Sequence, residues 1–152
     1  MTAIRKPQRT TGDPVLIGWR ERVSLPGLGI GAFTAKIDTG ARSAALHATN
    51  IVREDHHVTF TLPLPRRKHH CRLPLKGLRR VKSSSGHIET RAVVETDVKI
   101  GRHLLKIDIT LTDRTDMGVA MLLGRTSIGH GFLVHPTRTN ILSPRKRKAS
   151  AS

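Results

Sequence analysis

One acidic residue stands where an apolar strand is expected to end and a tight turn to begin. Asp38 is followed by Thr39 and Gly40. Glycine lets the backbone turn tightly and brings N–H groups close to a carboxylate, and those donors stabilise the charged form. Threonine can hydrogen-bond to a neighbouring loop and stiffen the turn. The three residues therefore predict either a site for carboxylate chemistry, with Asp38 as the reacting group, or an ordinary turn.

The segment before Asp38 has the pattern of a half-buried strand that would position the carboxylate. In residues 32–37, Phe33, Ala35 and Ile37 fall on one face, and the three residues between them fall on the other. This period of two is typical of a strand with one face in a core. We therefore expect Asp38 to lie at the end of such a strand.

The histidines and Cys71 are candidate metal ligands, but their spacing does not favour zinc. A zinc hydrolase commonly uses His-Glu-x-x-His on a helix, and this motif is absent. His56-His57 and His69-His70 are adjacent pairs whose side chains would point apart on a strand, and we assign Cys71 to a basic loop. We therefore predict no metal, while the scattered histidines, His47 and His87 above all, stay open because distant residues can converge.

A nucleotide site is not indicated. The pattern Gly-x-x-x-x-Gly-Lys-Ser/Thr is missing. The closely spaced glycines of residues 27–31 are better explained as a turn before the strand. We predict no cofactor, and any dependence on ATP would have to come through a partner enzyme.

Short strands separated by turns dominate the chain. The two arms 91–100 and 103–112, joined at Gly101-Arg102, predict a β-hairpin. Only residues 41–48 and 125–130 could form short helices, because no stretch has an apolar stripe at helical spacing over three turns. The pattern predicts an all-β fold, a barrel or a sandwich. The other expected strands are 15–19, 58–62, 121–123, 132–134 and 140–142.

Positive charge is concentrated in a few segments. The net charge is +16, and residues 62–82 hold eight lysines and arginines and no acid. Such a field should attract polyanions such as RNA, an acidic peptide or an anionic surface. The segment can equally be a solvated loop that keeps the protein soluble. One tryptophan, three phenylalanines and no tyrosine argue against a base-stacking platform for single-stranded nucleic acid.

The ends of the chain differ in composition from its middle. We predict a disordered basic arm at 1–13, a domain at 14–142 and a disordered basic tail at 143–152 that contains Arg145–Lys148. A single cysteine suits a reducing compartment. No apolar signal region and no run of about 18 apolar residues is evident. We therefore expect a cytoplasmic protein with no membrane partner.

Longer blocks of the sequence resemble a known family. They are residues 18–21, 36–48, 81–87, 111–114 and 121–125. A strand leading into Asp-Thr-Gly-Ala, a hairpin, an apolar-apolar-Gly segment and a short helix, in this order, resemble the retropepsin-like aspartic peptidases. The blocks are more closely similar to the bacterial subgroup labelled ATP-dependent zinc proteases. That subgroup is found with an ATP-grasp enzyme that adds glutamates to a small-subunit ribosomal protein. The resemblance runs from about Val15 to Leu142.

The resemblance implies a closed retropepsin-like β-barrel with one or two short helices. Asp38, Thr39 and Gly40 would form the catalytic loop, and an apolar-apolar-Gly segment passes beneath such a loop. The residues implied to support the loop are Leu122, Leu123, Gly124 and Arg125. Residues 83–86 would form the tip of a flap over the substrate. The residues implied in substrate binding are Lys36, Ala41, Arg42, Lys82, Ser83, Ser84, Ser85, Gly86 and His87. Lys36 and Arg42 could pair with glutamate carboxylates.

A single Asp-Thr-Gly supplies only half of such a site. Aspartic peptidases use two carboxylates, one as base toward water and one as acid toward the carbonyl. The sequence holds no second Asp-Thr-Gly or Asp-Ser-Gly. The resemblance therefore implies a two-fold homodimer that pairs Asp38 of each chain. It also implies an acidic protein substrate, such as a glutamate-tailed ribosomal protein, and the glutamate ligase as a possible partner.

Two hypotheses without catalysis remain open. A basic β-barrel that binds ribosomal RNA or the ribosome would explain the charge, but it gives no reason for the block around Asp38. A degenerate peptidase fold that serves as a binding module would explain the blocks, although the intact Asp38–Gly40 argues against it.

Overall fold

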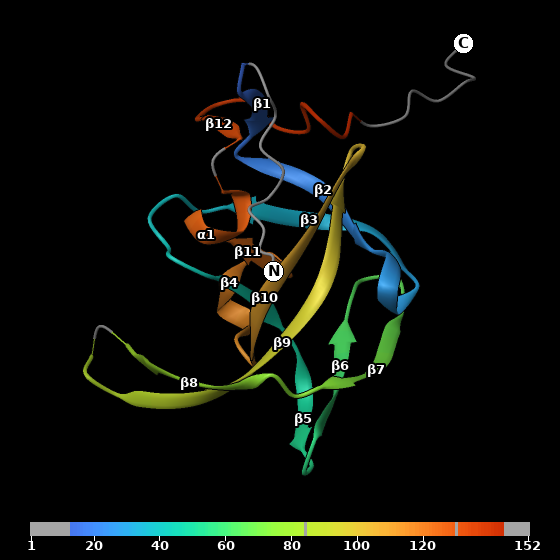
Figure 1. Cartoon of the computed structure of the whole chain (residues 1–152), viewed down its shortest axis with the longest axis vertical. Coiled ribbons are helices and arrows are strands. Elements are labelled where there is room, and N and C mark those ends of the chain that lie inside the picture. The colour runs from blue at the N-terminus through green and yellow to red at the C-terminus, as the bar shows by residue number, and fades with distance from the viewer. Residues whose placement is uncertain (1–12, 84, 130, 145–152) are drawn as a thin grey trace.

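The computed structural model describes residues 13–83, 85–129 and 131–144, which fold almost entirely as β-strands (Figure 1). The predicted all-β class is confirmed, with a closed barrel and a short helix, α1 (Arg125–Ile128). Two 3₁₀ turns, η1 (Pro26–Leu28) and η2 (Thr115–Met117), interrupt the strands. The strands are β1 (Val15–Gly18), β2 (Arg20–Leu25), β3 (Ile30–Ile37), β4 (Ala44–His47), β5 (Thr49–Arg53), β6 (His57–Pro63), β7 (Lys68–Pro74), β8 (Gly77–Lys82), β9 (Ile88–Ile100), β10 (His103–Thr112), β11 (Met121–Leu123) and β12 (Phe132–His135).

The barrel closes because β9 pairs with strands on both sides. The order β10–β4–β11–β3–β2–β9 returns to β10, and β8 lies outside this ring on the other edge of β9. The predicted hairpin is β9–β10, and Gly101 in its turn has a φ of +59°, which glycine adopts without strain. On β2, β3 and β4 every second residue enters the core, including Phe33, Ala35 and Ile37 on β3. The core therefore follows the period of two expected for these strands.

The basic segment 62–82 is not the loop that we predicted. It forms β7 and β8, which pair with β6 and β9. On β7 the half-buried Cys71 and Leu73 pack against the core, while Lys68 and Arg72 are exposed. Most positions of residues 68–74 hold cations or histidines, so the alternation of apolar and polar residues is too weak to predict a strand. Pairing with neighbouring strands decides the structure here.

Residues 41–48 contain a strand, not the short helix considered above. Ala44 and Leu46 are buried, while Ala45 and His47 are half-buried. β4 pairs with β10 on one side and with β11 on the other. Because β4 lies between two partner strands, an extended backbone can place its alternate residues in the core. A short helix at this position would bury its apolar residues along one side only.

The strand expected at 140–142 does not form, because a buried carboxylate takes the place of a partner strand. Glu21 is fully buried and accepts hydrogen bonds from Ile141 N (2.9 Å) and Ser143 N (3.0 Å). It also accepts from Leu142 N, from Gly18 N (2.6 Å) and from the Ser143 hydroxyl (2.6 Å). Buried N–H groups must be paired, and Glu21 satisfies several of them at once.

The contacts at Glu21 extend past the predicted domain boundary, because Ser143 was assigned to the tail. Residues 1–12 and 145–152, which hold nearly all of the predicted arm and tail, lie outside the described residues. The described helix is too short and too polar to cross a membrane.

Candidate active site

The turn at Asp38 is held by main-chain bonds at the end of β3. Ile37 N donates to Trp19 O at 2.8 Å, and Asp38 N donates to Leu123 O at 2.9 Å. Within the turn, Gly40 N donates to Asp38 Oδ1 at 3.0 Å and Ala41 N donates to Asp38 O at 3.1 Å. Asp38 is half-buried, while Thr39 and Gly40 are exposed. The carboxylate is therefore both positioned by the backbone and open to solvent.

β11 lies between β3 and β4 in the sheet and supports the Asp38 turn. Leu122 lies opposite Lys36 of β3 and opposite Ala45 of β4. At the end of β11, a Cβ on Gly124 would lie 2.5 Å from Ser43 O, which is far closer than real side-chain atoms approach. Only glycine fits beside the loop at this point.

Helix α1 fixes the carbonyl groups of the Asp38 loop. Arg125 N donates to Ala41 O at 2.9 Å, and an Arg125 guanidinium nitrogen donates to Thr39 O at 2.9 Å. Thr126 donates to Arg42 O from both its N–H (2.9 Å) and its hydroxyl (2.8 Å). The sequence did not single out Thr126. Its only signal is a hydroxyl residue directly after the glycine and arginine that follow the apolar strand.

One face of the sheet runs from the Asp38 loop to the base of the β8–β9 hairpin. Residues directly opposite on neighbouring strands share a face. Lys36 and Leu122 of the predicted site lie on this face next to each other, and Ala45 of β4 lies on the other side of Leu122. In order across the strands, the row is Arg20, Lys36, Leu122, Ala45, Thr110 and Val93.

The β8–β9 hairpin carries the residues implied to form the flap. Ser83 N donates to His87 O (2.8 Å), Gly86 N donates to Ser83 O (2.9 Å), and the Ser83 and Ser85 hydroxyls are 2.9 Å apart. Lys82 and His87 are exposed beside this tip, and Ser84 lies outside the described residues. The hairpin and the loop between β3 and β4 project toward the same side of the molecule (Figure 1). Among the described residues, no hydrogen bond or ion pair joins the hairpin tip to residues 38–42.

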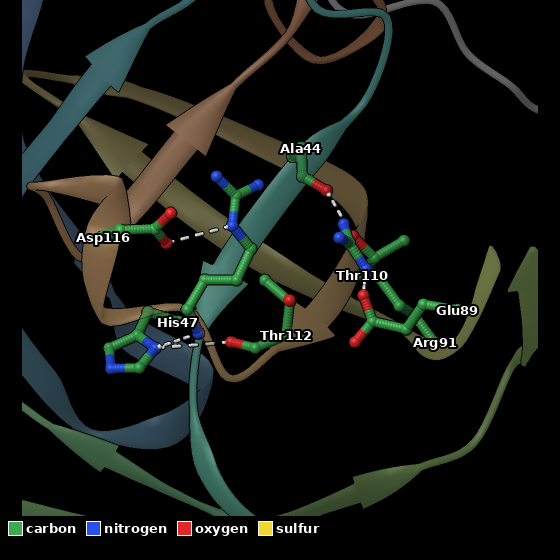
Figure 2. A network of polar contacts seen from close by, with 8 residues as sticks. Ala44, His47, Glu89, Arg91, Thr110, Thr112 and Asp116 are labelled. Atoms are coloured by element: carbon green, nitrogen blue, oxygen red, sulfur yellow. Dashed lines mark hydrogen bonds and ion pairs between the residues drawn. The ribbon is translucent and has the colours of Figure 1, made fainter. Parts of the chain in front are cut away.

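A polar network lies where β4, β9 and β10 meet, and Figure 2 shows it from close by. His47 Nδ1 accepts from Arg114 N at 3.0 Å, which assigns the ring proton to Nε2. Thr110 donates its hydroxyl to Ala44 O at 3.2 Å. On β9, the Arg91 side chain is only 12% exposed, and its guanidinium donates to Glu89 at 3.0 Å. The network ties strands together and leaves His47 engaged with the backbone.

Arg91 is a site candidate that the sequence did not indicate. It lies directly opposite Arg79 across β8 and β9, so two cations face one another. Like charges in this position are unfavourable, and Glu89 neutralises only one of them. Strand register, which the sequence alone does not give, places this pair on the β8–β9 hairpin.

The remaining charges of residues 62–82 differ in their partners. Lys76 contacts Asp108 (2.8 Å) and Glu95 (3.6 Å), and the hydrogen bond to Asp108 raises the pKa of Lys76. Arg72 lies 3.5 Å from Glu54. The exposed Arg66, Arg67, Lys68, Arg80 and Lys82 make no ion pair within the part of the chain that the structure describes.

Candidate metal ligands do not gather in the described ranges. No three histidine, cysteine, aspartate or glutamate side chains there are placed to hold an ion together. His70 instead lies 3.1 Å from the Thr61 hydroxyl, and burial raises the pKa of the Cys71 thiol.

Comparisons with known proteins agree with this architecture. A family model described as RimB-like, retropepsin-like aspartic endopeptidase RimB, matches residues 16–145. The crystal structure of Lpg0085, a protein of unknown function from Legionella pneumophila, superposes with a TM-score of 0.72 and 29% identity. The match covers 84% of this chain and 98% of that chain.

Curated relatives are longer than this chain. A Shewanella halifaxensis protein named "Probable alpha-L-glutamate ligase" is 36% identical over 132 residues, which is 82% of this chain and 29% of that protein. A protein of the same name from Parasynechococcus marenigrum is 37% identical over 130 residues, 80% of this chain and 28% of its own length. The chain thus spans less than a third of these relatives.

Proposed function

The chain belongs to the RimB-like family of retropepsin-like aspartic endopeptidases, and on this premise we propose that it cleaves peptide bonds as a homodimer with one Asp38 from each protomer. The observation that carries the proposal is the Asp38 turn, which β11 and α1 hold through the bonds to Leu123, Ala41 and Thr39. A turn braced in this way keeps a reacting carboxylate in place, and rigid support of this kind is typical of catalytic groups.

The proposed chemistry needs two carboxylates that share one proton. The ionised carboxylate takes a proton from a water molecule as the water attacks the scissile carbonyl, and the protonated carboxyl donates its proton to the carbonyl oxygen. Gly40 N–H binds Asp38 Oδ1, so Oδ2 is the oxygen available to the water. The chain has a single Asp-Thr-Gly, which supports a second copy of the chain as the source of the partner carboxylate.

We propose that the substrate is an acidic, glutamate-rich protein segment. Lys36 and Arg42 flank the Asp38 turn, and neither makes an ion pair with a described residue. Charge-assisted hydrogen bonds from such groups would hold substrate carboxylates. Relatives named as glutamate ligases contain a segment similar to this chain, which supports a ligase of that kind as a partner. A reducing, cytoplasmic setting fits a chain with one cysteine.

Cleavage of a peptide with a C-terminal glutamate tail, followed by mass spectrometry, tests the proposal. Wild type, Asp38→Asn and wild type with a zinc chelator are compared. The proposal expects cleavage that is lost in Asp38→Asn and indifferent to the chelator. Chelator-sensitive cleavage that survives Asp38→Asn would instead assign the reaction to the histidines.

Binding of ribosomal RNA without catalysis is the second candidate. The exposed, unpaired cations of residues 66–68 favour it. It predicts that Asp38→Asn leaves both RNA affinity and biological function unchanged, whereas the peptidase proposal predicts loss of function at unchanged folding.

A further inference from the structure

A row of cations leads away from Asp38 along the outer face of β2 and β3. Lys36 lies directly opposite Arg20, Arg22 follows two residues later on β2, and Ser24 lies opposite Lys99 of β9. On β2, burial alternates from Arg20 to Leu25, so Arg20, Arg22 and Ser24 share the outer face. Lys36, Arg20, Arg22 and Lys99 are called the basic track below.

The basic track ends in an open pocket of about 580 Å³. Arg22, Ser24, Lys99, Ser143 and Pro144 are among the residues that line it. The Arg22 guanidinium donates to Ala32 O at 3.1 Å, and Ser143 is held by Glu21 and by Arg22 N. Two of the lining residues, Arg22 and Ser143, are thus held in place, and in sequence the cations Arg145–Lys148 follow directly after Pro144.

The four cations of the track are not neutralised by any acid in the described part of the chain. None of them makes an ion pair with any described residue, whereas Lys76, Arg91 and Arg114 all do. Arg20 Nε is buried without a hydrogen-bond partner among the described residues. On β9 the acids next to the track, Asp97 and Glu95, are engaged by Lys106 and Lys76. Cations facing one another across β2 and β3 are unfavourable unless an anion joins them.

We propose that the basic track is an exosite that binds an acidic stretch of the substrate polypeptide outside the cleaved bond, with the pocket as its far end. The inference rests on the proposed function, since the track begins beside Asp38. Side chains on one face of a strand repeat about every 6.6 Å, both in β2 and in an extended peptide. Carboxylates of an acidic chain can therefore meet successive cations of the track.

The chemistry of the track favours a polypeptide over single-stranded nucleic acid. Nucleic-acid grooves of that kind combine cations with aromatic rings on which bases stack. The ring nearest the track belongs to Trp19, and the Arg20 guanidinium already covers it at 4.7 Å from the ring centroid. No other aromatic side chain lies among the residues of the track and its pocket.

Binding of a labelled peptide of about ten glutamates, roughly 33 Å when extended, tests the exosite in the Asp38→Asn protein. We expect Arg22→Glu with Lys99→Glu to weaken binding about tenfold more than a control of equal charge change, because close ion pairs add to the general field. The control is Arg53→Glu with Arg66→Glu, two exposed cations away from the track that make no described ion pair. Lys99→Glu alone, whose side chain makes no described hydrogen bond, guards against misfolding of the double variant.

Kinetics of the active protein give a second readout. The track variants should raise KM for a long glutamate-tailed substrate and leave kcat, and cleavage of a short peptide that covers only the scissile region, unchanged. Equal loss of binding in the control would overturn the exosite and assign the effect to net charge. A larger effect on an RNA oligonucleotide than on the peptide would overturn it in favour of nucleic acid. Cleavage that survives Asp38→Asn would defeat the proposed function while leaving the binding result intact.

Discussion

At the scale of single residues, the contacts that position Asp38 are different from the group that is proposed to react. Backbone bonds to Leu123 and Gly40 fix the turn, while no described residue donates a hydrogen bond to the second carboxylate oxygen of Asp38. An asparagine has nearly the same shape and keeps an oxygen that accepts from Gly40 N–H. The residue can therefore be changed chemically with little effect on the fold.

Asp38→Asn should lower the rate of peptide cleavage by about a thousandfold or more, because it removes a group that transfers protons. Its melting temperature should match that of wild type, since the Gly40 bond survives. Cleavage rate by mass spectrometry and thermal unfolding by circular dichroism check both statements. A variant that keeps more than a tenth of wild-type activity would contradict the assignment of Asp38.

The Cys71 thiol should react slowly with iodoacetamide in the folded protein. Burial raises its pKa, so less of the reactive thiolate is present near neutral pH. The reaction rate should rise at higher pH than it does for the same cysteine in denatured protein. Mass spectrometry of the modified chain at several pH values measures this, and identical rate profiles in both states would contradict it.

At the scale of elements, β11 and α1 together support the Asp38 loop. β11 pairs with β3 and β4, and α1 binds the carbonyls of Thr39, Ala41 and Arg42 immediately afterwards. Gly124 joins the two elements at the closest approach to the loop. A change at this joint should therefore affect both stability and the position of Asp38.

Gly124→Ala should lower the free energy of unfolding by about 1–3 kcal/mol, because the new methyl group would overlap Ser43 O and Ala41 O. Cleavage should fall as well, since the loop must move. Gly31→Ala is the matched control, because no neighbouring atom lies within 4 Å of its added Cβ. Chemical denaturation measures the difference, and equal stability of the two variants would refute the tight fit.

Glu21→Gln should destabilise the fold by about 2–4 kcal/mol, because an NH₂ group would replace an acceptor among several buried N–H donors. Part of the lost stability should come from the release of residues 141–143, which Glu21 anchors. Glu95→Gln serves as the comparison, since among the described residues its half-exposed carboxylate contacts only Lys76, at 3.6 Å. Hydrogen exchange of residues 141–143 reports the release of the segment, and unchanged protection would argue against the anchoring role.

At the scale of the whole molecule, the chain carries one Asp-Thr-Gly loop, and exposed lysines and arginines lie on several of its strands. The proposed active species needs a second chain, yet each chain carries a net charge of +16. Repulsion between such chains weakens as salt rises. Assembly and activity should therefore both depend on protein concentration and on ionic strength.

Mixing equal amounts of wild type and Asp38→Asn tests the shared site directly. If subunits exchange and each site needs two copies of Asp38, only roughly a quarter of the sites stay active by random pairing. Independent monomers would instead retain half of the activity. Sedimentation of the same samples shows whether mixed dimers form, and half activity in a sample of mixed dimers would disprove the shared dyad.

The sequence by itself determined the local features of this protein. Local sequence patterns show the period of two in residues 32–37 and the two strand-like arms around Gly101. The all-β class and the β9–β10 hairpin could therefore be predicted. Asp38, with the threonine and glycine after it, marks a candidate site for the same reason. The resemblance of longer blocks then indicated the family that the comparison with known proteins confirms.

Only the tertiary structure decided what depends on contacts between distant segments. The weak apolar pattern of residues 68–74 becomes a strand because β6 lies beside it, and residues 44–47 become extended because they lie between β10 and β11. Glu21 replaces the partner that the expected strand at 140–142 lacks. Strand register also aligns the basic track from Lys36 to Lys99. The sequence gives the charge and hydrophobicity of each residue. Folding alone brings together the distant residues with which each one packs, pairs or forms hydrogen bonds.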